Sequence, residues 1–215
     1  MRDIKQQMKT PAIWKKLLFD GKKVATSKEL MDLADRLGKG RERSLSYLRE
    51  HGYIVRIGRG IYYVRSADER ERGFHEWSVY EMVAAAMSAR RIERWYFGLE
   101  TALKLNAMTH EYFTIDSVIT DSAWTSKPVC VLDSKFHFFK WSAIHFGFGI
   151  VRKGRLAYSD PEKTVLDLAY RAHRSGKGEP RAIIDEHVSK LDRDKLSNYL
   201  KRYPQRFRNA LEVVP

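Results

Sequence analysis

The sequence of 215 residues predicts an α+β fold divided between two domains. Apolar residues recur at helical spacing near both ends of the chain, while short β-rich runs separated by turn residues fill its middle. Between Ser66 and Ser78 the run SADERERGFHEWS is polar and poorly periodic, and it separates a pattern that ends in strands from one that begins with a helix. We therefore expect one domain over residues 1–72 and a second over residues 73–215.

The charge of the chain favours a partner that carries phosphate. Lys and Arg number 40 and Asp and Glu 27, which gives a formal net charge of +13. Residues 1–72 hold 18 basic and 10 acidic residues, a net charge of +8, and the other 143 hold 22 and 17, a net charge of +5. The positive field is therefore expected mostly on the first domain.

Composition also excludes several classes of protein. Cys130 is the single cysteine, so neither a disulfide framework nor a cysteine-rich zinc site is available. No apolar run reaches the roughly 20 residues needed to cross a bilayer, and the start MRDIKQQMKT has no apolar segment for export. We expect a cytoplasmic protein with no cofactor and no metal.

Helical spacing predicts three helices in the first domain. The first covers residues 8–20, and the second begins with Thr26 or Ser27 as its N-cap and stops at Gly38. A third, from about residue 41 to 51, follows the short link GKG. Two helices joined by a tight glycine turn have helix-turn-helix geometry.

A β-hairpin is predicted directly after the third helix. The strands YIVRI and IYYVR flank GRG, whose glycines suit a tight turn with Arg59 at its tip. Three helices followed by a two-stranded ribbon is the order of a winged helix-turn-helix domain. Tyr62 and Tyr63 face opposite sides by the two-residue period of a strand, so we expect one in the core and the other near a DNA backbone.

These elements predict a DNA-binding surface. The third helix fits the major groove, where Arg41 and Arg43 near its start are the candidates for reading guanine, with Ser44 and Tyr47 next. Further arginines are expected to hold phosphates, which sets affinity and salt dependence but reads no sequence. These are Arg49, Arg56, Arg59 and Arg65. Because winged helices also dock proteins, a protein-docking module is the alternative.

The second domain is predicted to be a mixed α+β body with a small, mainly antiparallel sheet. Helices are expected over residues 76–91 and after Gly98, and the β-rich runs FTIDSVITD, KPVCVLD, KFHFFKW and IHFGFGIV follow. Another helix begins at Pro161, with Ser159 or Asp160 as its N-cap. Two further helices, around residues 181–190 and 193–202, complete the domain.

The chain resembles the AbiEi-type antitoxins of bacterial and archaeal abortive-infection loci and related transcriptional regulators. The resemblance runs in order through the winged helix, the motif GLETALKLNAMT, the small sheet and the motif YSDPEKTVLDLAY. Its most specific residues are Gly98, Glu100, Thr101, Ala102 and Leu103 in the first motif and Asp160, Pro161, Glu162, Lys163, Thr164, Leu166 and Asp167 in the second.

This resemblance implies a regulator that represses its own operon and has no catalytic residues. It also implies a C-terminal domain that assists repression and counteracts a nucleotidyltransferase toxin encoded alongside, without stable toxin binding in at least some systems. One winged helix reads few base pairs, so two copies on an inverted repeat in the promoter would be an economical source of specificity. A homodimer is the corresponding expectation.

Two other functions stay open from the residues alone. Asp121, Asp133 and Lys135 have the spacing of a metal-dependent nuclease, in which two acids hold a divalent ion and a lysine assists the attacking water. Asp-x-Lys is also a pattern common by chance at strand ends, and turn chemistry explains both aspartates. The other alternative is a winged-helix regulator that senses a small ligand.

Two clusters of the second domain are interpreted as structural. Asp160 and Glu162 suit the cap and the dipole of their helix, and Asp167 suits a solvated face. The aromatic residues between 136 and 148 alternate like two strands, which favours packing in a core or interface. A platform that stacks bases of single-stranded nucleic acid is the alternative.

Overall fold

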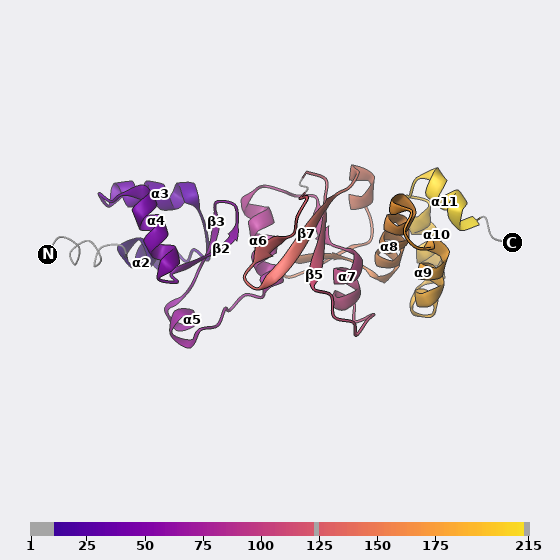
Figure 1. Ribbon diagram of the computed structural model, residues 1–215, viewed down its shortest axis with the longest axis horizontal. Coiled ribbons are helices and arrows are strands. Elements are labelled where there is room, and N and C mark those ends of the chain that lie inside the picture. The colour runs from indigo at the N-terminus through magenta and orange to yellow at the C-terminus, as the bar shows by residue number, and fades with distance from the viewer. Residues whose placement is uncertain (1–10, 123–124, 213–215) are drawn as a thin grey trace. The chain divides into compact units, whose positions relative to one another are not determined.

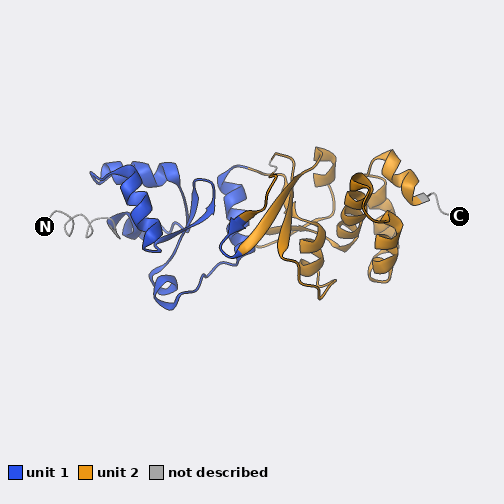
Figure 2. Cartoon of the chain, viewed as in Figure 1, with its two compact units in different colours: residues 1–91, 130–133 blue, residues 92–129, 134–215 orange. Residues whose placement is uncertain are grey.

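The structure is a computed structural model that describes residues 11–122 and 125–212 (Figure 1). The chain forms two compact units, and Figure 2 shows them in different colours. The first unit is Met1–Arg91 with Cys130–Asp133, and the second is Ile92–Val129 with Ser134–Pro215. The expected domain boundary near residue 72 stays a prediction.

The first unit contains a winged helix-turn-helix. Its described elements are α2 (Pro11–Phe19), β1 (Val24–Thr26), α3 (Ser27–Arg36), α4 (Arg41–Glu50), β2 (Ile54–Gly58), β3 (Ile61–Val64), α5 (Ala67–Arg72) and α6 (Val79–Ala89). The sheet has the order β1-β3-β2 with antiparallel pairing throughout. The predicted helices and hairpin are present, and β1, which the sequence pattern did not reveal, makes β3 the central strand.

Reciprocal caps fix where several of these helices begin. At α3 the Thr26 hydroxyl accepts from the Glu29 N–H, and the Glu29 carboxylate accepts from the Thr26 N–H at 2.8 Å. Ser66 and Glu69 form the same arrangement at α5. Helix α5 therefore stands where the sequence pattern predicted only a polar link, because its short length hides any helical period.

Both faces of the wing sheet are covered in the first unit. Tyr62 packs with apolar residues of α2, α3 and α4 in one core, and Tyr63 lies on the other side against Trp77, with ring centroids 5.3 Å apart. Helix α6 contacts all three strands. The expectation that one of the two tyrosines is free to approach DNA is therefore wrong, since both are buried.

The second unit joins a six-stranded sheet to helices. Its elements are β4 (Trp95–Phe97), α7 (Leu99–Leu105), β5 (Ile115–Thr120), β7 (Ser134–Lys140), η1 (Ala143–Phe146), β8 (Ile150–Lys153), β9 (Leu156–Ser159), α8 (Pro161–Ser175), α9 (Pro180–His187), η2 (Val188–Lys190), α10 (Arg193–Leu200) and α11 (Gln205–Glu212). The sheet also includes β6 (Val129–Val131), of which only Val129 belongs to the second unit. The strand order is β6-β7-β5-β4-β9-β8. The α+β class is confirmed.

The sheet contains both parallel and antiparallel pairs. Strand β4 pairs parallel with β9, and β5 pairs parallel with β7, whereas the β4–β5 and β8–β9 pairs are antiparallel. Strands β4 and β9 were not anticipated, and part of the expected strand IHFGFGIV is the 3-10 turn η1. Among the described residues, no helix combines the length and the apolar character needed to span a membrane.

Candidate nucleic-acid interface

Helix α4 begins without a side-chain cap and is held by an ion pair instead. Gly40 is its N-cap, and no side-chain hydrogen bond is formed there. Arg41 reaches back to Asp35 on α3, with its Nε 3.0 and 2.8 Å from the two carboxylate oxygens and its Nη2 2.5 Å from one of them. This fork fixes α4 against α3 and directs the Arg41 guanidinium toward a carboxylate.

The exposed side of α4 differs from the expected one at two positions. Arg43 and Arg49 are exposed, as a DNA contact requires. Ser44 is 5% exposed and faces the interior with Leu48, so its hydroxyl is not presented at the surface. Tyr47 is half-buried and stacks on His51 with ring centroids 3.9 Å apart, and burial raises the pKa of its phenol.

The wing presents two of the predicted arginines. Arg56 on β2 and Arg59 in the turn between β2 and β3 are both exposed. Gly60 follows with a φ of +71°, a conformation that favours glycine, and its carbonyl accepts from the Ser27 N–H at 2.8 Å. The turn is therefore held on α3 while Arg59 extends from it.

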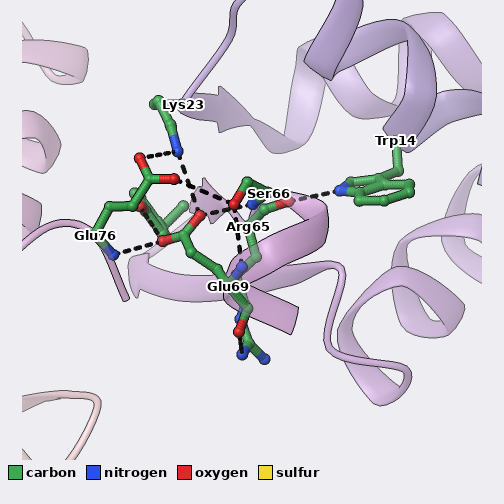
Figure 3. Close-up of polar contacts among 7 residues, drawn as sticks. Trp14, Lys23, Arg65, Ser66, Glu69 and Glu76 are labelled. Atoms are coloured by element: carbon green, nitrogen blue, oxygen red, sulfur yellow. Dashed lines mark hydrogen bonds and ion pairs between the residues drawn. The ribbon is translucent and has the colours of Figure 1, made fainter. Parts of the chain in front are cut away.

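Arg65 stands at the centre of a structural network (Figure 3). Its carbonyl accepts from the Trp14 indole at 2.7 Å, and its Nη2 donates to the carbonyl of Glu69. The side chain is half-buried and its Nε is enclosed. Arg65 thus joins the end of β3 to α2 and α5. The sequence analysis expected a phosphate contact for Arg65 and did not anticipate this structural role.

Arg70 on α5 has a structural role in the first unit that sequence reasoning missed. Its guanidinium lies 3.6 Å from the ring centroid of Tyr53 and 5.1 Å from that of Trp14, and its Nη2 donates to the carbonyl of His51 at 3.3 Å. These contacts join α5 to the residues that follow the carboxyl end of α4. No periodicity in the sequence could reveal it, because α5 itself was not expected.

In the second unit, the DPEKTVLD segment ties α8 to α10. Asp160 caps α8 by accepting from the Lys163 N–H at 3.0 Å, as predicted, and also accepts from the Tyr199 hydroxyl at 2.9 Å. Lys195 contacts Asp160 at 3.0 Å and Glu162 at 2.7 Å. Both carboxylates have structural roles here.

Asp167 is buried rather than solvated, which corrects the sequence interpretation. Its carboxylate accepts from the hydroxyls of Tyr96 at 2.8 Å and Tyr203 at 2.5 Å, and from Lys163 Nζ at 3.2 Å. Both Lys163 and Asp167 have side chains that are 0% exposed. The second family-like motif therefore builds a buried polar network.

The aromatic run packs in the interior. Phe136 and Trp141 are buried, and the four phenylalanines at 138, 139, 146 and 148 are half-buried. Because none of them presents an exposed ring, the structure favours packing over the alternative of a base-stacking platform.

Gly98, at the start of α7, is enclosed by its neighbours. A Cβ on this residue would lie 2.6 Å from Ile119 Cδ1 and 3.0 Å from Tyr96 Cε2. We expect Gly98→Ala to lower the free energy of unfolding by about 1–3 kcal/mol through overpacking. Gly147→Ala, where nothing lies within 4 Å, is the matched control. Urea unfolding of both variants is the measurement, and equal stability of the two would contradict the expectation.

A groove in the second unit has the size of a ligand site. Its volume is about 690 Å³, and Leu103, Met108 and Leu168 contribute apolar wall. Glu100 and Arg171 form an ion pair within it, with Nη1 3.0 Å from Oε2. Small-molecule sites span roughly 300–1,000 Å³ and have mostly apolar walls with a few polar groups.

Two of the three residues of the nuclease hypothesis, Asp121 and Lys135, lie far apart. In the parallel β5–β7 pair Ile115 lies opposite Lys135, and Asp121 follows the other end of β5. Asp121 is six residues from Ile115, which in an extended chain is about 20 Å. Asp121 instead pairs with Arg94 at 3.3 Å. Among the described residues, no group of three or more His, Cys, Asp or Glu side chains is placed to hold a metal ion.

Comparison with known proteins connects these observations to a family. Residues 16–65, which cover most of the winged helix, match the family model described as transcriptional regulator, AbiEi antitoxin. This match confirms the resemblance over that segment. No curated protein matches the chain.

Solved structures with a similar fold include one of a mycobacterial protein. The crystal structure of the RV2827C protein from Mycobacterium tuberculosis aligns with a TM-score of 0.58 over 93% of this chain and 75% of that chain, at 14% sequence identity. At this identity the likeness concerns the fold alone.

Proposed function

We propose that this chain is a cytoplasmic, sequence-specific DNA-binding repressor of its own operon and the antitoxin of a nucleotidyltransferase toxin. The observation that carries the DNA-binding part is the set of exposed arginines on α4 and the wing of a winged helix: Arg43, Arg49, Arg56 and Arg59. The family match over residues 16–65 supports a transcriptional regulator with antitoxin relatives.

In this proposal α4 enters the major groove. Arg43, in the first turn, donates two hydrogen bonds to guanine, and Arg49, Arg56 and Arg59 contact phosphates. Arg41 and Arg65 contribute less than the sequence reading expected, because Asp35 and Glu69 already engage their guanidinium groups. Ser44 is left out because it is buried.

Two copies bound to an inverted repeat would complete the operator. A single recognition helix contacts few base pairs, and a dimer places two such helices about one helical turn of DNA apart. In this proposal the second unit assists repression and acts against the toxin, as the resemblance implies.

We expect Arg43→Ala/Arg49→Ala to lose promoter preference. Wild type should favour the duplex upstream of its own gene over a scrambled duplex, and the double variant should lose about 10- to 100-fold of this preference while keeping weak, salt-sensitive binding. A salt-titrated binding assay measures both quantities. Arg181→Ala/Arg193→Ala removes the same charge from exposed positions of the second unit and should keep the preference. Equal preference in wild type and Arg43→Ala/Arg49→Ala would reject α4 as the reader.

The groove beside α7 and α8 favours a second candidate, a regulator that senses a small ligand. Leu99 and Ala107, at the two ends of α7, have positive φ angles of 57° and 54°, and each precedes a residue of the groove wall. Strained backbone of this kind gathers at ligand sites. A small molecule that changes the DNA affinity of wild type but not of Ser175→Trp, whose ring would fill the groove, would establish this candidate.

A further inference from the structure

The burial pattern of α4 defines which side of the helix is presented outward. Ser44 and Leu48 are its buried residues, and they lie one turn apart on the same side. Ser46 is two residues from each, which places it about 200° around the helix from both. Ser46 is exposed. It therefore lies at the centre of the outward face, opposite the buried stripe.

Charged residues surround Ser46 on that face. Glu42 and Arg43 precede it by four and three residues, and Arg49 and Glu50 follow it by three and four, so all four are its neighbours on the helix surface. All four are exposed. The centre of the face is therefore small and polar, while longer side chains stand around it.

Arg41 lies at the edge of the buried stripe instead. It precedes buried Ser44 by three residues, and its guanidinium makes the fork on Asp35 described above. Both side chains of this pair are substantially exposed, at 60% and 42%. The pair thus links α4 to α3 at the surface and directs the Arg41 guanidinium toward Asp35.

We propose that Ser46 is a base-contacting residue at the centre of the reading face, and that Arg41 is a positioning residue that acts through Asp35. This inference rests on the proposed DNA-binding function. A serine hydroxyl donates and accepts, so it can pair with either kind of base edge, and its small size lets the helix approach the groove floor closely. Arg43 and Glu42 flank it with groups that suit guanine and cytosine.

Selection from duplexes with randomised positions tests the role of Ser46. Wild type should yield a motif, and Ser46→Arg should yield one in which guanine is gained at a position of each half-site. The affinity of Ser46→Arg for the wild-type motif should fall at least tenfold. Ser46→Ala should keep the motif but relax one position. Ser88→Arg, at an exposed serine of α6, should leave the motif unchanged.

The outcomes separate the two levels of the proposal. An unchanged motif in Ser46→Arg, with only stronger salt-dependent binding, would overturn the role of Ser46 while leaving sequence-specific binding intact. Absence of any motif in wild type would reject the proposed function itself, together with this inference. Circular dichroism of each variant confirms that it is folded.

Exchange of the charges tests the role of Arg41. Asp35→Asn should weaken binding to the wild-type motif several-fold with an unchanged salt slope, since no phosphate contact is lost. Asp35→Arg/Arg41→Asp should restore affinity and the same motif. If the exchanged pair instead loses one base preference, Arg41 itself reads DNA and the positioning role is wrong.

Discussion

Asp167→Asn is expected to lower the free energy of unfolding of the second unit by about 3–5 kcal/mol, the usual cost of leaving one partner of a buried ion pair uncompensated. The substitution keeps the shape of the side chain, so little of this loss comes from a cavity. Lys163 would remain buried with its Nζ 4.4 Å from the ring centroid of Phe148 and 4.8 Å from that of Tyr96. Neither ring replaces a carboxylate.

The physical reason lies in opposing effects of burial and pairing. Burial raises the pKa of the Asp167 carboxyl, and the nearby Lys163 and the two tyrosine hydroxyls oppose that rise. Burial lowers the pKa of the Lys163 amine, and Asp167 opposes that change. Each charge is tolerated in the interior mainly because the other is present.

A double-mutant cycle measures this dependence. We expect Lys163→Met/Asp167→Asn to be more stable than Asp167→Asn alone, because an uncharged pair leaves no buried ion. Hydrogen exchange resolved on peptides of residues 156–212 reports the stability of the second unit. Asp185→Asn, in the exposed pair with Arg181, is the control and should cost less than about 0.5 kcal/mol. A loss below about 1 kcal/mol in Asp167→Asn would contradict the expectation.

Asp167 also shows where sequence reasoning reaches its limit. The capped start of α8 could be predicted because an N-cap and a proline at the first position are local signals. The burial of α8 on most of its sides could not be predicted. Helices α7, α9 and α10 all pack against it and bury polar positions along with apolar ones. A Lys and an Asp four residues apart resemble a surface pair in sequence.

The elements of the candidate interface could be predicted from the sequence, whereas the surroundings of some of its side chains could not. The apolar signal of α4 consists of Leu45 and Leu48, and two residues leave the centre of the buried stripe uncertain by one position. One position turns the helix by about 100°, enough to move Ser44 from the outward side to the buried stripe. The partners of Arg41 and Arg65 are set by tertiary packing and leave no signal in the sequence, and the DNA contacts of both residues stay a prediction.

Strands β4 and β9 were missed for a related reason. They are three and four residues long, too short to establish a period. Each is stabilised by pairing with strands distant in sequence, such as the parallel contact between Phe97 and Tyr158. Non-local pairing of this kind leaves no signal in a short window of sequence.

Glu69→Gln is expected to remove a pH-dependent part of the stability of the first unit. Glu69 is 0% exposed, and its carboxylate accepts from the Ser66 N–H at 2.6 Å, the Tyr63 hydroxyl at 2.5 Å and the Glu76 N–H at 2.8 Å (Figure 3). Lys23 Nζ lies 3.3 Å away. Burial alone would raise the pKa of this carboxyl, but the donors together outweigh it and lower the pKa from 4.5 to about 2.

The sign of the effect follows from that lowered pKa. A carboxyl whose pKa is lower in the folded state stabilises the fold fully above pH 4.5, and this contribution is lost as the pH falls toward 2. The shift corresponds to about 3 kcal/mol. Wild type and Glu69→Gln should therefore differ by about that amount at pH 7, and the difference should shrink steadily between pH 4.5 and 2.

Hydrogen exchange of the full chain at several pH values, corrected for intrinsic rates, tests this on peptides of residues 11–91. The difference between wild type and Glu69→Gln isolates Glu69 from other carboxylates that titrate in the same range, such as Glu29, which accepts from Lys22 and Thr26. Glu71→Gln, at an exposed position of α5, should match wild type at every pH. A difference that stays constant between pH 7 and 2.5 would mean that Glu69 stabilises the first unit through packing and not through its charge, because only a charge-dependent contribution disappears when the carboxyl takes up a proton.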